Sequence, residues 1–193
     1  MYAPAGLETG DAGKVATILQ ERLATLVDLS LTLKHVHWNV IGPGFIAVHE
    51  MMDTQVDSTR TMVDAVAERI TTLGGVAAGL AGQVNEMRHA NDDYALGRGP
   101  LAAHLGALDK VYEQACSGHR TAIEQVGSID PVSEDLLISQ LAELELNHWF
   151  VRAHISDTDG RLATHGTLTQ LDAAAAATYA LQPEVVSEVD PED

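Results

Sequence analysis

The hydrophobic pattern of the chain predicts long amphipathic helices and gives little sign of a sheet. Between residues 11 and 40, apolar side chains recur every seven positions at Leu19, Leu26 and Leu33, with Leu23 in the interleaved series. This spacing places one continuous apolar stripe along one face of a helix. Alternating strand patterns and two-residue hairpin signals are nearly absent. We therefore expect an all-α protein.

Prolines and glycines divide the body of the chain into long segments, because both residue types interrupt helices. The segments expected to be helical are 11–40, 45–73, 100–127 and 131–157. Residues 74–99 contain six glycines and are expected to form a long crossover, with a short helix around Asn91–Leu96. A long connection between the second and third helices is the ferritin-like form of a four-helix bundle.

The length of 193 residues and a hydrophobic content of 46% fit a single folded domain. We expect an N-terminal arm over residues 1–10, the bundle over 11–160, and a C-terminal tail over 161–193 with a mobile acidic end. Cys116 is the single cysteine, so an internal disulfide is excluded. No apolar run approaches the roughly 20 residues that cross a bilayer, and we expect no secretory signal, because residues 1–14 lack a basic stretch followed by an apolar one. The expected location is the cytoplasm.

The charge balance favours cations as partners. Eleven basic residues stand against 28 acidic ones, for a net charge of −17. Such a chain should repel nucleic acid and anionic membranes. The N-terminal arm as far as Thr17 offers only Lys14, and the tail from Gln182 onward has no Lys or Arg. DNA condensation is therefore the disfavoured alternative, and we do not expect association with the nucleoid.

Histidine and carboxylate positions indicate a metal site. His37 continues the apolar stripe of the first helix, whereas His35 falls on another face and is expected to point to solvent. At about 100° per residue, His49 lies in one arc with the acids Asp53, Asp57, Asp64 and Glu68. The alternative is a solvated charged face, and the presence of Arg60 in the same arc agrees with that alternative. The scarcity of cations among so many acids does not agree with it. Imidazole and carboxylates without thiolates favour iron or manganese over copper or a closed zinc site.

Helix geometry prevents one chain from using all of these ligands together. His49 and Glu68 are 19 residues apart, or about 28 Å along a straight helix. Asp53 and Asp64 are 11 residues apart, or about 16 Å. An antiparallel neighbour in a two-fold dimer would bring the two ends together and form two equivalent sites. The sequence therefore predicts a metal site that is shared between subunits.

These residues resemble the Dps family, the miniferritins named as DNA-binding proteins from starved cells. The resemblance rests on Lys34-His35-Val36-His37-Trp38-Asn39-Val40, on His49-Glu50-Met51-Met52-Asp53, and on Asp64 with Ala67-Glu68-Arg69. The successive spacings of 12, 4, 11 and 4 residues between the candidate ligands match the family pattern. Asp135-Leu136-Leu137 and Trp149-Phe150-Val151-Arg152-Ala153-His154 agree as well.

The resemblance implies a hollow shell of twelve chains that oxidises Fe(II), preferentially with hydrogen peroxide, and stores ferric mineral. It implies that His37, His49 and Asp53 of one chain bind iron together with Asp64 and Glu68 of a neighbouring chain. DNA would then be protected by the removal of Fenton reactants. The family also places Trp38 beside the site, where it gives up an electron to oxidants; a core aromatic is the alternative for this residue.

Three acids near the start of the fourth helix are candidate pore residues. The resemblance places a three-fold channel at Asp135, with Glu134 or Asp130 near it. The alternative is local, because acids in a first helical turn complement the helix dipole, and Asp130 or Ser133 can act as the N-cap.

Glu145-Leu146-Asn147-His148 contains the Glu-x-x-His motif of diiron bundles. A diiron oxygenase or manganese catalase would need a second such motif and glutamates from the other helices. No second motif lies in the predicted helices, so we expect His148 to be structural.

Overall fold

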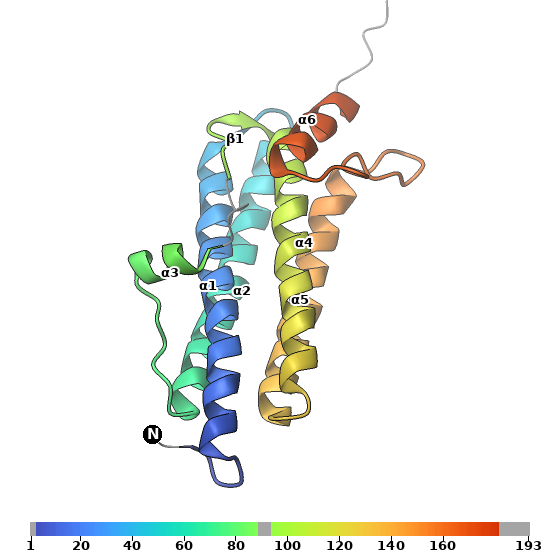
Figure 1. Cartoon of the computed structure of the whole chain (residues 1–193). Coiled ribbons are helices and arrows are strands. Elements are labelled where there is room, and N and C mark those ends of the chain that lie inside the picture. The colour runs from blue at the N-terminus through green and yellow to red at the C-terminus, as the bar shows by residue number, and fades with distance from the viewer. Residues whose placement is uncertain (1–2, 89–93, 182–193) are drawn as a thin grey trace, which may run out of the picture.

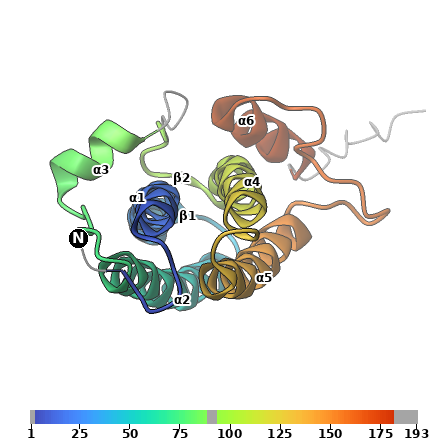
Figure 2. The same ribbon diagram turned by 60° about the horizontal axis from the view of Figure 1, so that its bottom comes forward.

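The structure, a computed structural model, describes residues 3–88 and 94–181. Four long helices form the body of the molecule: α1 (Thr9–Asn39), α2 (Phe45–Thr72), α4 (Leu101–Val126) and α5 (Pro131–His154). In Figure 2, α1 and α4 form one layer of the bundle, and α2 and α5 form the other. The predicted ferritin-like four-helix bundle is confirmed.

The crossover between α2 and α4 runs along the outside of α1 (Figure 1). Its short helix is α3 (Ala81–Met87). The predicted helix at Asn91–Leu96 is wrong for Tyr94–Leu96, which have no helical structure, while Asn91–Asp93 lie outside the described residues. After Tyr94 the chain pairs through β2 (Gly99–Pro100) with β1 (Val40–Ile41), as a short parallel ladder. The end of the crossover is thereby fixed beside the end of α1.

The apolar stripe of α1 lies in the core, as its spacing predicts. Leu19, Leu26 and Leu33 are each 0% exposed, and His37 is 8% exposed on the same face. Met52 and Val66 of α2 join them in one continuous cluster that extends to α4 and α5. Because apolar burial is the main force that orders helices, this cluster fixes where the last turn of α1 lies.

The hairpin that joins α1 to α2 depends on two glycines. Gly42 and Gly44 have φ angles of 108° and 78°, a region that side chains with a Cβ rarely adopt. Pro43 between them removes a backbone donor. The chain therefore reverses within a few residues, and the end of α1 lies against the start of α2.

Within the part of the chain that the structure describes, no helix is both long and apolar enough to cross a membrane.

The C-terminal segment contains a helix that the sequence pattern did not predict. The alanine-rich stretch forms α6 (Gln170–Ala180), which packs against α4 (Figure 1). Its Ala173, Ala174 and Ala177 are buried. The close approach requires Gly106 on α4, since a Cβ there would lie 2.4 Å from the Ala173 carbonyl oxygen.

A buried carboxylate fastens the loop that leads to α6. Asp109 on α4 is 0% exposed and accepts hydrogen bonds from His148 Nε2 at 2.7 Å, Arg152 Nε at 2.6 Å and Thr164 Oγ1 at 2.6 Å. Burial alone would raise the pKa of Asp109, but these donors outweigh it and hold the pKa well below its usual range. The loop therefore stays attached to α4 and α5 through an ionised group.

Gly106→Ala is expected to destabilise the protein and displace α6, because the added methyl group overlaps the Ala173 carbonyl. The cost should be roughly 1–3 kcal/mol, as for other overpacked contacts. The measurements are the denaturant concentration at the midpoint of unfolding and the rate of proteolysis in the loop before α6. Gly13→Ala is the matched control, because nothing lies within 4 Å of its added methyl group; it should stabilise α1 by up to about 1 kcal/mol. Equal midpoints for the two variants would contradict the close α4–α6 contact.

Candidate metal centre

The end of α1 and the beginning of α2 bring three potential ligands together. One ligand atom each from His37, His49 and Asp53 lies within 4.8 Å of the others. The hairpin brings His37 and His49 together, and one helical turn then carries Asp53 to the same side as His49. Among residues 3–88 and 94–181 this is the one such group of His, Cys, Asp and Glu side chains.

Two reciprocal hydrogen bonds set the orientation of the imidazoles. His37 Nδ1 donates to the carbonyl of His49 at 3.0 Å, and His49 Nδ1 donates to the carbonyl of His37 at 3.1 Å. Because a carbonyl only accepts, each Nδ1 carries the proton, and each Nε2 keeps a free lone pair for a metal. The rings stack with centroids 3.6 Å apart, and the Phe45 ring lies 4.9 Å from that of His49.

Asp53 is held by a cation that the sequence analysis missed. The Lys34 ammonium forms an ion pair with its carboxylate, and His37 Nδ1 lies 3.3 Å from the same oxygen. The hydrogen bond from Lys34 lowers the pKa of Asp53, burial opposes it, and electrostatic interactions with His37, Lys34 and His49 add to the lowering. Asp53 is thus ionised and ready to bind a cation. Lys34 lies three positions before His37 on α1, and that helical spacing was the available signal.

The other predicted ligands lie farther along α2. Asp64 and Glu68 are both exposed on this helix. Eleven residues separate Asp53 from Asp64, or about 16 Å of helix. Asp57, on the same stripe, is also exposed. One chain therefore brings together His37, His49 and Asp53 but leaves Asp64 and Glu68 too far along α2 to join them.

Trp38 and His35, which lie close to His37 in the sequence, differ in their exposure. Trp38 is 70% exposed, so in the single chain it is not a core aromatic. His35 was expected to face solvent, and that expectation is wrong. It is half-buried beneath the crossover, and its Nε2 donates to the Leu96 carbonyl at 2.6 Å. The crossover follows no helical pattern, so the spacing on α1 could not reveal this cover.

Glu145 and His148 do not form a metal motif in the described structure. The exposed Glu145 pairs with Arg120, and the buried His148 donates to Asp109. Both side chains line a surface groove of about 480 Å³ between α4 and α5. The hydrogen bond from His148 to Asp109 agrees with the structural role that we expect for this histidine.

The three candidate pore acids differ in exposure. Asp130 is 5% exposed and accepts a 2.6 Å hydrogen bond from Arg69 and one from Ser133. Burial would raise the pKa of Asp130, but these donors leave it lowered. Glu134 is half-buried, and Asp135 is exposed in the first turns of α5. Asp135 is thus the acid of this group that a single chain presents to solvent.

Comparison with known proteins gives the family of this chain. Residues 16–160 match the ferritin-like domain family. The DNA protection during starvation protein of Mycolicibacterium smegmatis is 48% identical over 169 residues, which cover 88% of this chain and 92% of that protein. The chain belongs to the Dps family.

Other known proteins are similar to this chain as well. The solved structure of DpsA14 from Streptomyces coelicolor superposes with a TM-score of 0.82 at 56% identity, over 84% of this chain and 96% of that chain. The fine tangled pili major subunit of Haemophilus ducreyi is 45% identical over 81% of this chain and 82% of its own length. Membership of the Dps family supports iron storage and DNA protection as the general role of this chain, and it implies that the protein binds iron.

Lys34→Met is expected to tighten metal binding at the His37–His49–Asp53 group, because the ammonium competes with the metal for Asp53. An exposed ion pair is worth at most about 1 kcal/mol, so the affinity should rise up to about fivefold. Anaerobic titration with Co²⁺ measures this. Lys14→Met is the matched control, since Lys14 pairs with Asp11 near the other end of α1. Unchanged or weaker binding by Lys34→Met would contradict the competition.

Proposed function

We propose that this protein oxidises Fe(II) at centres shared between two subunits, preferentially with hydrogen peroxide, and stores the ferric product inside a shell of twelve chains. The observation that supports this most directly is the incomplete ligand set of one chain. Two imidazoles and one carboxylate converge within 4.8 Å. They leave coordination positions that a second chain is expected to fill.

The missing ligands of the proposed centre are Asp64 and Glu68 of the partner. The roughly 16 Å of helix between Asp53 and Asp64 prevents the two ends of α2 from meeting in one chain. A two-fold axis that pairs α2 with an antiparallel copy brings each His49–Asp53 end beside the other chain's Asp64–Glu68 end. The symmetry then produces two equivalent centres in each dimer.

Fe(II) is the substrate, and the side chains bind it and keep positions open for the oxidant. The two Nε2 atoms supply nitrogen ligands, and the carboxylates offset the positive charge. One hydrogen peroxide and two protons take one electron from each of two Fe(II), and the products are two Fe(III) and two water molecules. Two-electron reduction of peroxide in this way avoids hydroxyl radical. Trp38, exposed beside His37, is the side chain placed to supply an electron when the iron does not.

Iron is proposed to enter through acidic channels lined by Asp135, with Glu134 beside it. The position of these two acids at the start of α5 and the exposure of Asp135 support this proposal. Asp130 is the weakest of the three original candidates, because Arg69 and Ser133 already bind its carboxylate.

Replacing both His37 and His49 with Ala should abolish the fast first phase of Fe(II) oxidation while the shell still assembles. The measurement is ferric absorbance after anaerobic loading with Fe(II) and addition of stoichiometric peroxide, compared with the rate in air. His154→Ala with His165→Ala is the matched control, because both histidines are exposed and lie outside the group. An unchanged initial rate in the His37/His49 variant would disprove the site assignment.

Co-assembly of two inactive variants tests whether the centre is shared. One variant lacks His49 and Asp53, and the other lacks Asp64 and Glu68. A mixed dimer then contains one doubly damaged centre and one intact centre, so part of the activity should return. Dimers shown to be mixed but still inactive would point to a centre within one chain.

The protein is expected not to bind DNA appreciably at physiological salt, so its protection of DNA is chemical. Each chain carries −17 charges, and DNA affinity arises mainly from Lys and Arg that displace counterions from phosphates. Arg88, one of the few crossover cations, already pairs with Asp28 at 3.0 Å. A gel-shift titration at about 150 mM salt, where the screening length is near 8 Å, provides the measurement. A retarded complex at submicromolar protein would contradict this expectation and favour the DNA-condensing alternative.

A further inference from the structure

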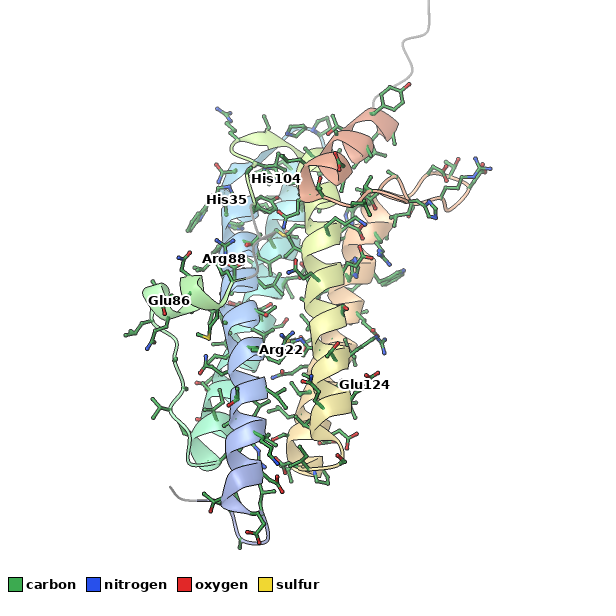
Figure 3. All side chains as sticks on the ribbon, viewed as in Figure 1. Arg22, His35, Glu86, Arg88, His104 and Glu124 are labelled. Carbon is green, nitrogen blue, oxygen red and sulfur yellow. The ribbon has the colours of Figure 1, made fainter. Side chains whose placement is uncertain are left out.

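One histidine outside the metal group connects α4 to the crossover beside the end of α1. His104 lies in the first turns of α4 and is 0% exposed. Figure 3 places it near His35 in the space between α1 and α4. The sequence analysis gave it no role, and it does not belong to the His37–His49–Asp53 group.

The two ring nitrogens of His104 differ in their hydrogen bonding. Nδ1 lies 2.8 Å from the Tyr94 hydroxyl, and the two rings stack with centroids 6.0 Å apart. Burial lowers the pKa of His104, and its buried Nε2 makes no hydrogen bond within the described residues. The Tyr94 hydroxyl also lies 3.4 Å from the His104 carbonyl, so both the ring and the backbone of His104 face Tyr94. His104 therefore connects α4 to the crossover at Tyr94.

The same stretch of crossover contacts α1 at two further points. His35 Nε2 donates to the Leu96 carbonyl, and the edge of the His35 ring meets Tyr94 with centroids 5.8 Å apart. Three residues beyond Leu96, Gly99 pairs with Val40 in the β1–β2 ladder. The end of α1 is thus held from His35 to Val40 on the side away from the metal group.

α6 covers this connection from outside. Ala174 of α6 packs with Ala103 and Ala107 of α4, and Tyr94 and Leu96 of the crossover lie against this small cluster. Burial raises the pKa of the Tyr94 hydroxyl well above its usual range, so it stays a neutral donor. The Tyr94–His104 hydrogen bond is therefore shielded from competing water.

We propose that His104, together with Tyr94, is a positioning residue of the iron centre: it holds the crossover against the end of α1 so that His37 keeps its place beside His49 and Asp53. The inference rests on the proposed function of that centre. The crossover contacts α1 at His35 and pairs with Val40, so its two contacts stand on either side of His37 in the sequence. Ligands must be held within about 0.5 Å to act together. Neither His104 nor Tyr94 touches the substrate in this arrangement.

The test compares variants that remove the Tyr94–His104 hydrogen bond from either side. Tyr94→Phe removes one oxygen atom and leaves the ring against His35. His104→Phe removes the bond from the α4 side, whereas His104→Gln retains a polar side chain for the Tyr94 hydroxyl. Tyr179→Phe is the matched control, because Tyr179 is 82% exposed. Each assembled apo-protein is titrated anaerobically with Co²⁺, and its thermal midpoint and particle size are recorded.

We expect His104→Phe to weaken Co²⁺ binding by less than about tenfold, because that is the smallest usual loss when a direct partner of a metal ligand is removed, and His104 acts through the crossover. Tyr94→Phe and His104→Gln should show smaller losses, and Tyr179→Phe none. The Fe(II) concentration for half-maximal oxidation should rise in the same order, with little change in the rate at saturation.

The wild-type protein separates this inference from the function on which it rests. If wild-type protein binds Co²⁺ and loses it on His37→Ala, while Tyr94→Phe and His104→Phe bind normally at a lower thermal midpoint, the residues only stabilise the fold and the inference is wrong. If wild-type protein shows no Co²⁺ site that depends on His37, the proposed centre itself is wrong. Tyr94→Phe keeps the test decisive even if His104→Phe does not assemble.

Discussion

The rise of α2 along its axis determines how this chain can form a metal site. A straight helix advances about 1.5 Å per residue, so His49 and Asp53 at one end cannot share a metal ion with Asp64 and Glu68 at the other. A ferritin-like bundle with its ligands inside one four-helix core has no such restriction. Here the candidate ligands lie on a single helix and its hairpin, and in the centre that we propose a second chain supplies the remaining ligands. In that proposal the geometry of one helix links assembly to chemistry.

The half-centre within one chain depends on backbone groups more than on side-chain packing. His37 and His49 each donate to the other's carbonyl, so the spacing of two main-chain segments sets the spacing of two Nε2 atoms. The hairpin with Gly42 and Gly44 makes this spacing possible. An error in the relative position of α1 and α2 would shift both ligands at once. If the crossover positions the end of α1 as we propose, its contacts there serve the geometry of the metal group as well as the stability of the fold.

Charge is distributed unevenly between the interior and the surface. Buried acids such as Asp109 and Asp130 are each surrounded by several donors, and the loss of one partner would leave a charge uncompensated at a cost of about 3–5 kcal/mol. Surface acids make up much of the net charge of −17, and such a surface attracts cations and repels the phosphates of nucleic acid. In the function that we propose, the same excess of acids opposes nucleic-acid binding and raises the local concentration of Fe(II).

The sequence by itself determined the four helices, because the heptad spacing of leucines and the positions of prolines and glycines are local signals. It also determined that His37 faces the core, that His49 and Asp53 share a face, and that Asp64 and Glu68 lie too far away. Only the tertiary structure decided what covers α1: α3 at Ala81–Met87, the contact of Leu96 with His35, and the ion pair of Lys34 with Asp53. The docking of α6 on Gly106 was equally hidden, since an alanine run has no amphipathic pattern and its partner is far away in the sequence. Helical periodicity encodes which face of a helix is buried, but it carries no information about which irregular segment packs on the other faces.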